Sequence, residues 1–302
     1  MALMAGLVIH SFIIGVNVSD WWRGRSVTPV DLIVTSLGIS RMCTQSTITI
    51  DVILLMFLQS YPHSEVLLDI MATLYVFFTS INIWLTSLLS VVLCLKISNL
   101  HTRLFLYLRR MILHRTGCLI AASGIVSIIN SLLNLLLAIK KIHEGRTHNS
   151  TIHELFIDCM DINSVCTFTA GAFFPLLLYF TSSVLLFVSL YHHTTRMKMS
   201  SNLSINLETY YSAMKLVSFT FMYNTVYLFS HITSLLYHHL YCYTSPWIHV
   251  VLDFLPVLHS SYLIYRTAKL RNQMSKVLHN VMDYLFQRKT TENIENIEIV
   301  DR

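Results

Sequence analysis

Charged side chains are scarce in this chain of 302 residues. Asp, Glu, Lys and Arg make up 12% of it, against about 25% in ordinary soluble proteins. Hydrophobic residues make up 54%, and the mean hydropathy is +0.58. This composition leaves little room for a water-soluble domain. The formal net charge of +5 is modest, and we expect no nucleic-acid partner.

Motifs of enzymes and metal sites are also missing. The six cysteines show no C-x-x-C spacing, the fifteen histidines are scattered without H-E-x-x-H, and no Gly-rich phosphate loop is present. We therefore expect no enzyme activity, no catalytic residues, no cofactor and no metal. Internal repeats and paired interrupted helices, which mark many transporters, are absent as well. A small-molecule transporter or channel nevertheless stays open as an alternative function.

Long uncharged segments dominate what is present. Residues 70–95 form a run of 26 residues without a charged side chain, which exceeds the roughly 20 needed to cross a bilayer. Within it Thr79, Asn82 and Thr86 share one helical face, as in a helix packed inside a bundle. Basic residues follow this run. The predicted crossings are 1–18, 30–58, 70–95, 116–139, 171–191, 215–237 and 247–265, and 98–115 and 192–214 are predicted loops.

The distribution of Lys and Arg sets the orientation. Of the 21 such residues, 17 lie on the side that contains the loop after the first crossing, three lie on the other side, and Arg41 lies within the membrane. Cytoplasmic loops carry the excess of positive charge, so the N-terminus is outside and the C-terminus inside. Seven crossings agree with this, because an odd number separates the termini. The predicted fold is an all-α membrane protein, a seven-transmembrane helix bundle.

The chain divides into a membrane domain, 1–267, and a cytoplasmic tail, 268–302. Residues 269–289 carry an apolar stripe opposite basic side chains, which predicts a helix on the inner membrane surface. From 290 the tail is polar and acidic, and we expect disorder. Of three Asn-x-Ser/Thr triplets, the one at Asn149 lies in the long outer loop and is the predicted glycosylation site.

Several short motifs then occur in order along the crossings, over about residues 6–271. Each resembles a motif of the vertebrate bitter taste receptors, the type 2 taste receptor family of G protein-coupled receptors. The rhodopsin-like D-R-Y and N-P-x-x-Y motifs are missing, as they are in that family. The matching motifs are L-G-I-S-R at 37–41, K-I-S-N at 96–99 after Trp84, L-F-V-S-L at 186–190, Y-L-F-S at 227–230 and H-S at 259–260.

The resemblance is not complete. His10 stands where the family usually has Asn, and the first helix is short at its outer end. No cysteine lies at the outer start of the third helix, so the disulfide typical of rhodopsin-like receptors is not expected. Otherwise the resemblance implies a multi-pass plasma-membrane receptor that binds small bitter molecules. It also implies signalling through a gustducin-type heterotrimeric G protein, phospholipase C and calcium. Whether the receptor forms an oligomer is not determined by the sequence.

Ligand-binding candidates come from two kinds of reasoning. By register with the family, the pocket positions fall on Tyr75, Thr79, Tyr227 and His249, for which ordinary packing between helices is the alternative. Asp253 is selected by physics, because an ionisable group inside a membrane is costly unless paired or hydrated. It favours a cationic or amine-bearing ligand. The alternative is that Asp253 only pairs with Arg41 or accepts a hydrogen bond from Tyr75.

Two further sets of residues follow from the resemblance. Arg41, His259 and Ser260 are the predicted conformational switch, with a structural role as the alternative. A second set is expected to surround the opening for the C-terminal helix of a G protein, although positive charge is expected on that side in any membrane protein. This G-protein-facing set is Lys96, Arg103, Arg109, His193, Met197 and Lys215.

Overall fold

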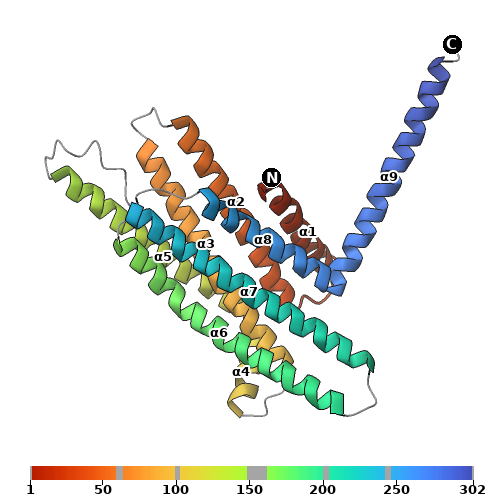
Figure 1. The fold of residues 1–302 in the computed structure, drawn as a ribbon, viewed down its shortest axis with the longest axis horizontal. Coiled ribbons are helices and arrows are strands. Elements are labelled where there is room, and N and C mark those ends of the chain that lie inside the picture. The colour runs from red at the N-terminus through yellow and green to blue at the C-terminus, as the bar shows by residue number, and fades with distance from the viewer. Residues whose placement is uncertain are drawn as a thin grey trace.

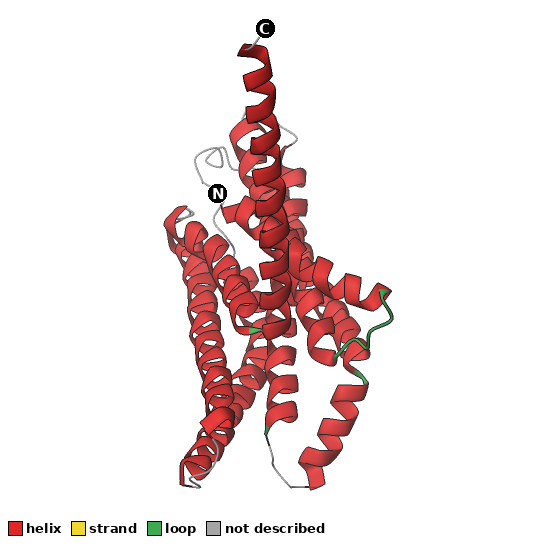
Figure 2. Ribbon diagram, turned by 90° about the vertical axis from the view of Figure 1, so that its right-hand side faces the viewer, coloured by secondary structure: helices red, strands yellow, loops and turns green. Residues whose placement is uncertain are grey.

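The computed structural model describes residues 2–58, 64–98, 103–147, 162–199, 204–241 and 246–300. Within these ranges the chain is almost entirely α-helical and shows no strand (Figures 1 and 2). The helices are α1 (Ala2–Trp22), α2 (Pro29–Leu58), α3 (Ser64–Ile97), α4 (Arg103–His114), α5 (Thr116–Thr147), α6 (Ile162–Met199), α7 (Ser204–Tyr241), α8 (Pro246–Arg266) and α9 (Ala268–Val300).

Seven of these helices, α1, α2, α3, α5, α6, α7 and α8, contain the predicted crossings and confirm the seven-helix bundle. Among the described residues, four segments are long and apolar enough to cross a membrane by length and composition alone: Leu3–Trp22, Ile70–Ile97, Thr116–Leu137 and Val165–His192. The more polar α2 belongs to the bundle because its polar side chains turn inward. Arg41, Thr44 and Gln45 are all buried there.

Three segments predicted to be irregular are largely helical where the structure describes them. The predicted loop 98–115 contains α4, whose Ile112 and Leu113 pack on the core while Arg103 and Arg110 face outward. The predicted loop 192–214 is shortened, because α6 continues to Met199 and α7 begins at Ser204. In the tail α9 continues to Val300, where disorder was expected. Neither 192–214 nor 269–300 contains a Gly or Pro to end a helix.

The turn between α1 and α2 shows why these two helices begin and end where they do. Gly24 has a positive φ of 71°, the left-handed conformation that commonly ends a helix. At the start of α2, the Asp31 amide donates to Thr28 Oγ1 at 3.2 Å and the Thr28 amide donates to Asp31 Oδ2 at 3.3 Å. This reciprocal pair caps the helix, and Pro29 occupies its first turn without losing a needed donor.

The largest buried apolar cluster lies where α1, α2, α3 and α8 meet, close to the inner end of the bundle. α3 is the central helix, in contact with α2, α4, α5 and α6. From the end of α8, α9 runs away from the bundle and crosswise to its helices (Figure 1). The cluster consists of Ile13, Ile33, Val34, Leu37, Leu85, Leu89, Val92, Ile264 and Leu270.

Close packing between α5 and α6 depends on a missing side chain at Gly171. A Cβ atom there would lie 2.7 Å from Asn130 Oδ1. We expect Gly171→Ala to lower the free energy of unfolding by about 1–3 kcal/mol, the usual cost of overpacking. Gly124→Ala is the control, because a Cβ there meets nothing within 4 Å. Thermal unfolding of both variants in nanodiscs checks this; equal midpoints would contradict it.

Candidate functional site

Arg41 joins three helices near the middle of the bundle. Its side chain is 3% exposed. Nη1 lies 3.0 Å from His259 Nδ1 and donates to Ser260 Oγ at 2.9 Å, both on α8. Nη2 donates to Tyr223 Oη on α7 at 3.3 Å. The predicted switch residues Arg41, His259 and Ser260 are therefore in direct contact, and Tyr223 is a partner that sequence reasoning missed.

The acceptors around Arg41 are all uncharged. If His259 Nδ1 accepts from Arg41, the imidazole carries its proton on Nε2, which faces Thr220 Oγ1 at 3.4 Å. The His259 ring also stacks on Tyr223, with centroids 4.4 Å apart. The guanidinium carbon of Arg41 lies 5.4 Å from the Tyr223 ring centroid, within cation–π range. Hydrogen bonds and ring faces thus replace water around this buried cation.

A row of rings on α7 leads from this contact toward the outer half of the bundle. Tyr223, Tyr227 and His231 are spaced by four residues and share one face of α7. Tyr227 packs edge-on to His231 at 4.7 Å, and His231 Nδ1 lies 3.5 Å from Tyr75 Oη on α3. His231 therefore links the predicted ligand residues Tyr75 and Tyr227. The four-residue spacing was the signal in the sequence that would have found it.

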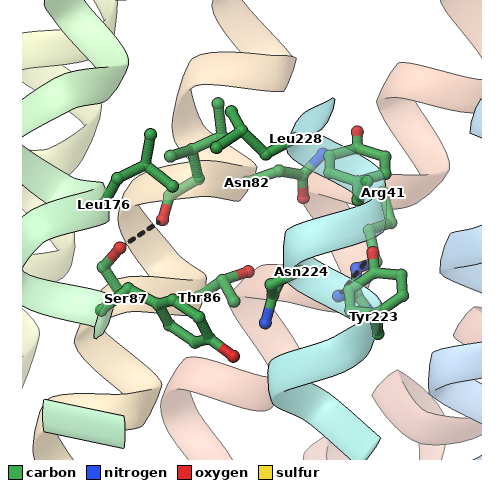
Figure 3. A pocket seen from close by; sticks show the side chains of 11 residues that line it. Arg41, Asn82, Thr86, Ser87, Leu176, Tyr223, Asn224 and Leu228 are labelled. Atoms are coloured by element: carbon green, nitrogen blue, oxygen red, sulfur yellow. Dashed lines mark hydrogen bonds between the residues drawn. The ribbon is translucent and has the colours of Figure 1, made fainter. Parts of the chain in front are cut away.

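A small cavity lies between the predicted ligand residues and the switch. Its volume is about 20 Å³, which suits one water molecule. Arg41, Asn82, Thr86, Tyr223 and Asn224 are among its walls (Figure 3). Pockets for drug-sized ligands measure about 300–1,000 Å³. A small molecule at this depth therefore requires the surrounding helices to separate.

Thr79 is buried and Asp253 is half-buried near this region. Thr79 is fully buried on α3, one turn inward of Tyr75. Asp253 on α8 lies within electrostatic reach of Tyr75 and Tyr227. Among the described residues its carboxylate makes neither the ion pair with Arg41 nor the hydrogen bond with Tyr75 considered above, and its Oδ1 has no hydrogen-bond partner. The side chain of His249 lies outside the described set, as does Asn149.

The predicted G-protein-facing residues come from the inner ends of α3, α4, α6 and α7. Lys96, Arg103 and Lys215 are exposed and Arg109 is half-buried. His193 and Met197 lie on α6, but their side chains are outside the described set. Between α3, α6 and α7 a compact apolar cluster fills the centre. This inner cluster consists of Cys94, Leu186, Leu190 and Val217, with Leu93, Ile97 and Met214 against it.

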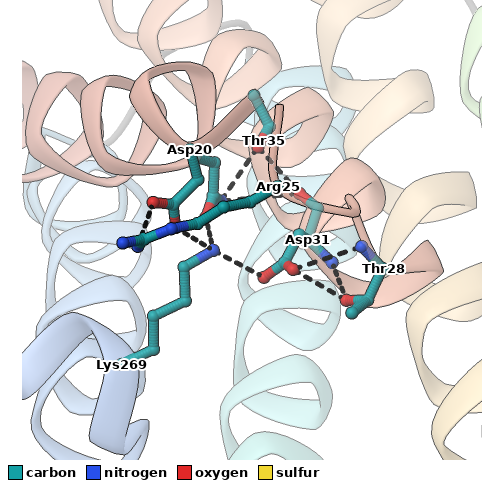
Figure 4. A network of polar contacts seen from close by, with 7 residues as sticks. Asp20, Arg25, Thr28, Asp31, Thr35 and Lys269 are labelled. Carbon is teal, nitrogen blue, oxygen red and sulfur yellow. Dashed lines mark hydrogen bonds and ion pairs between the residues drawn. The ribbon is translucent and has the colours of Figure 1, made fainter. Parts of the chain in front are cut away.

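A polar clasp holds the first turn of α9 to the inner ends of α1 and α2 (Figure 4). Lys269 Nζ donates to Asn17 Oδ1 at 2.9 Å and lies 3.0 Å from Asp20 Oδ2 and 3.4 Å from Asp31 Oδ1. Arg25 Nη1 adds a 2.9 Å ion pair with Asp20 Oδ1. These residues border a cavity of about 390 Å³. Sequence reasoning placed Lys269 in the basic tail and gave it no contact with α1 or α2.

Removing the clasp should loosen α9. Lys269→Met deletes three partly exposed polar contacts, worth together about 1–2 kcal/mol. We expect amide hydrogen exchange in the first turns of α9 to speed up about 5- to 30-fold at low salt and less at high salt, because ions screen the pairs. Lys276→Met, an exposed lysine on the same helix, is the control. Unchanged exchange in Lys269→Met would mean that packing alone holds α9.

Comparison with known proteins agrees with this architecture. A sequence model of the family described as "Taste receptor protein (TAS2R)" matches residues 1–282. The human protein "Taste receptor type 2 member 2" is 25% identical over 281 residues, covering 90% of this chain and 91% of that protein. "Taste receptor type 2 member 9" of Macaca mulatta is 28% identical over 303 residues, covering 95% of this chain and 94% of that protein.

A solved structure shares this fold as well. The crystal structure of squid rhodopsin superposes with a TM-score of 0.60 at 12% sequence identity, covering 93% of this chain and 84% of that one. At that identity the likeness shows the seven-helix fold alone. The family match, which spans nearly the whole chain, shows more. The chain belongs to the type 2 taste receptor family of G protein-coupled receptors, which are multi-pass plasma-membrane proteins and not enzymes.

Proposed function

We propose that this receptor binds small bitter molecules among the outer halves of α3, α7 and α8. Tyr75, Thr79, Tyr227 and Asp253 are the proposed contacts, with His249 at the outer end of α8. Tyr75 and Tyr227 both contact His231, so aromatic and polar surface is available on neighbouring helices. The Asp253 carboxylate favours ligands that carry an ammonium group, because opposite charges attract strongly away from water.

The observation that carries the proposal is the unbroken row of contacts from Tyr75 to Arg41. It passes from Tyr75 through His231, Tyr227 and Tyr223, with ring centroids 6.0, 4.7 and 5.7 Å apart in turn. A ligand that binds better to one arrangement of these side chains raises the population of the helix packing in which that arrangement occurs. Arg41 stands at the inner end of the row and holds α2, α7 and α8 together.

At the inner end we propose coupling to a gustducin-type heterotrimeric G protein, followed by phospholipase C activation and calcium release. The inner cluster, with Leu186, Leu190 and Val217 at its centre, lies where the C-terminal helix of the G protein would insert. Insertion requires α6 and α7 to move apart from α3. The basic side chains around it, Lys96, Arg103, Arg109 and Lys215, present positive charge to the partner.

Agonist-evoked calcium release tests the function. Cells expressing the receptor with a chimeric, calcium-coupled G protein are exposed to a library of bitter compounds, some with amines and some uncharged. We expect concentration-dependent calcium signals that vanish when the G protein is omitted. The rival reading, a transporter or channel, predicts solute or ion flux without the G protein. Flux of that kind, with no G-protein-dependent signal, would overturn the proposal.

A further inference from the structure

Two opposite charges lie in the interior without touching each other. Among the described residues, the Arg41 guanidinium hydrogen-bonds only to the uncharged His259, Ser260 and Tyr223. Asp253 Oδ1 is buried and has no hydrogen-bond partner among the described residues. Inside a membrane an uncompensated charge is costly, and attraction between opposite charges extends well beyond contact distance. The polar groups that lie near these two charges therefore matter to both.

Gln45 is the first of those groups. It lies one turn after Arg41 on the same face of α2, and its side chain is 3% exposed. Its Nε2 donates to the Asp253 backbone oxygen at 3.1 Å. Its Oε1 has no hydrogen-bond partner in the described part of the chain, and it faces α1 so closely that a Cβ atom at Gly6 would collide with it. Gln45 thus touches α8 with one end of its amide and α1 with the other.

His10 is the second. It follows Gly6 by one turn on α1, is fully buried, and lies within electrostatic reach of Arg41. A Cβ atom at Gly38 would approach the His10 backbone oxygen to 3.9 Å, so α1 and α2 are in close contact here. Neither ring nitrogen of His10 has a hydrogen-bond partner among the residues that the structure describes.

The buried polar atoms without hydrogen-bond partners on α1, α2 and α8 complement one another as donors and acceptors. A neutral imidazole has one N–H donor and one acceptor nitrogen, whereas Gln45 Oε1 and Asp253 Oδ1 are both acceptors. Buried polar atoms in native proteins find partners, often through a bound water. A neutral His10 therefore supplies the kind of donor that these two acceptors lack. The three unsatisfied groups are better explained as one network than as three separate defects.

We propose that Gln45 and His10 form a polar relay that couples the Asp253 carboxylate to the Arg41 guanidinium across α8, α1 and α2. When a ligand ammonium group pairs with Asp253, the relay reorients and weakens the hold of Arg41 on His259 and Ser260. Both relay members are positioning residues that contact no ligand. The proposal rests on the proposed receptor function and adds α1 to its switch.

The relay is tested without any agonist, by basal nucleotide exchange. The receptor is fused to its G protein α subunit, and GTPγS binding is measured in membranes and divided by surface expression. Asp253→Asn removes the carboxylate charge that favours the resting Arg41, so we expect basal exchange to rise about threefold or more. In a Gln45→Leu background the same substitution should change it less than about 1.5-fold, because coupled sites are non-additive. Asn134→Leu on α5 is the control background and should leave the Asp253→Asn effect intact.

Substitutions of His10 separate a relay from simple packing. His10→Asn keeps a donor and an acceptor and should preserve the coupling between Asp253→Asn and basal exchange. His10→Leu keeps apolar bulk and should abolish it; a packing role predicts the reverse order. Equal fold-changes in all backgrounds, or no effect of Asp253→Asn, would overturn the relay. Such a result leaves the proposed function standing as long as the wild-type receptor still gives agonist-evoked calcium signals.

Discussion

Replacing Arg41 by methionine should abolish agonist-evoked signalling without lowering the thermal stability of the receptor. In the part of the chain that the structure describes, its guanidinium hydrogen-bonds to uncharged groups only, so the desolvation cost of this buried cation is not offset by a contact ion pair. Methionine fills much of the same volume and removes that cost. The three hydrogen bonds that tie α2 to α7 and α8 disappear, and signalling that depends on them is lost.

Arg41→Lys sharpens this prediction. A lysine ammonium is a compact point charge and cannot reproduce the planar fork that reaches His259, Ser260 and Tyr223 together. We expect it to signal as poorly as Arg41→Met and to be less stable. Calcium responses normalised to surface expression, together with thermal unfolding in nanodiscs, are the measurements. A large fall in the unfolding midpoint of Arg41→Met, in step with its signal, would show that Arg41 is structural.

Replacing Asp253 by asparagine should weaken the response to amine agonists about 30-fold or more. Truncating one partner of a buried, hydrogen-bonded charge pair costs about 2–5 kcal/mol, and Asp253 Oδ1 is a buried acceptor without a competing partner in the described chain. Uncharged agonists, which make no such pair, should lose less than about threefold. Asparagine has nearly the same shape, so the packing of α8 is retained.

The measurement is a pair of concentration–response curves, one for an amine agonist and one for an uncharged agonist from the same library. Asp283→Asn, an exposed carboxylate on α9, is the control and should shift neither curve. Equal loss of both responses in Asp253→Asn would mean that Asp253 supports the bundle rather than selects the ligand. Retention of both would remove amines from the proposed ligand class.

The crossings and the orientation were predictable because they depend on local properties. A run such as 70–95 is by itself long and apolar enough to cross a bilayer. The number of Lys and Arg residues in each loop gives the orientation without any knowledge of packing. The family motifs, such as that around Arg41, were equally local. Errors arose where a helix depends on its neighbours. The 12 residues of α4 are amphipathic by themselves, but the core surface on which Ile112 and Leu113 pack exists only in the folded bundle.

The candidate site was only partly predictable for the same reason. Register with the family placed Tyr75 and Tyr227 on facing helices, but His231, which contacts both, came only from the structure. The clasp at Lys269 joins residues 252 positions apart in the chain, from Asn17 on α1 to the first turn of α9. Nothing in the sequence distinguishes a tail lysine that forms such a clasp from one that only adds positive charge to the cytoplasmic side.

Arg41 shows both what the sequence determines by itself and what only the tertiary structure decides. From the sequence alone it was a cation inside a membrane segment, and the cost of burying it already required polar partners and placed it in a bundle. Which partners it has is decided by the tertiary structure, because His259, Ser260 and Tyr223 come from helices about two hundred residues away and reach it only when α2, α7 and α8 pack together. The same holds for Asp253: its place inside a membrane segment followed from hydropathy, whereas the hydrogen bond from Gln45 to its backbone oxygen is a property of the fold.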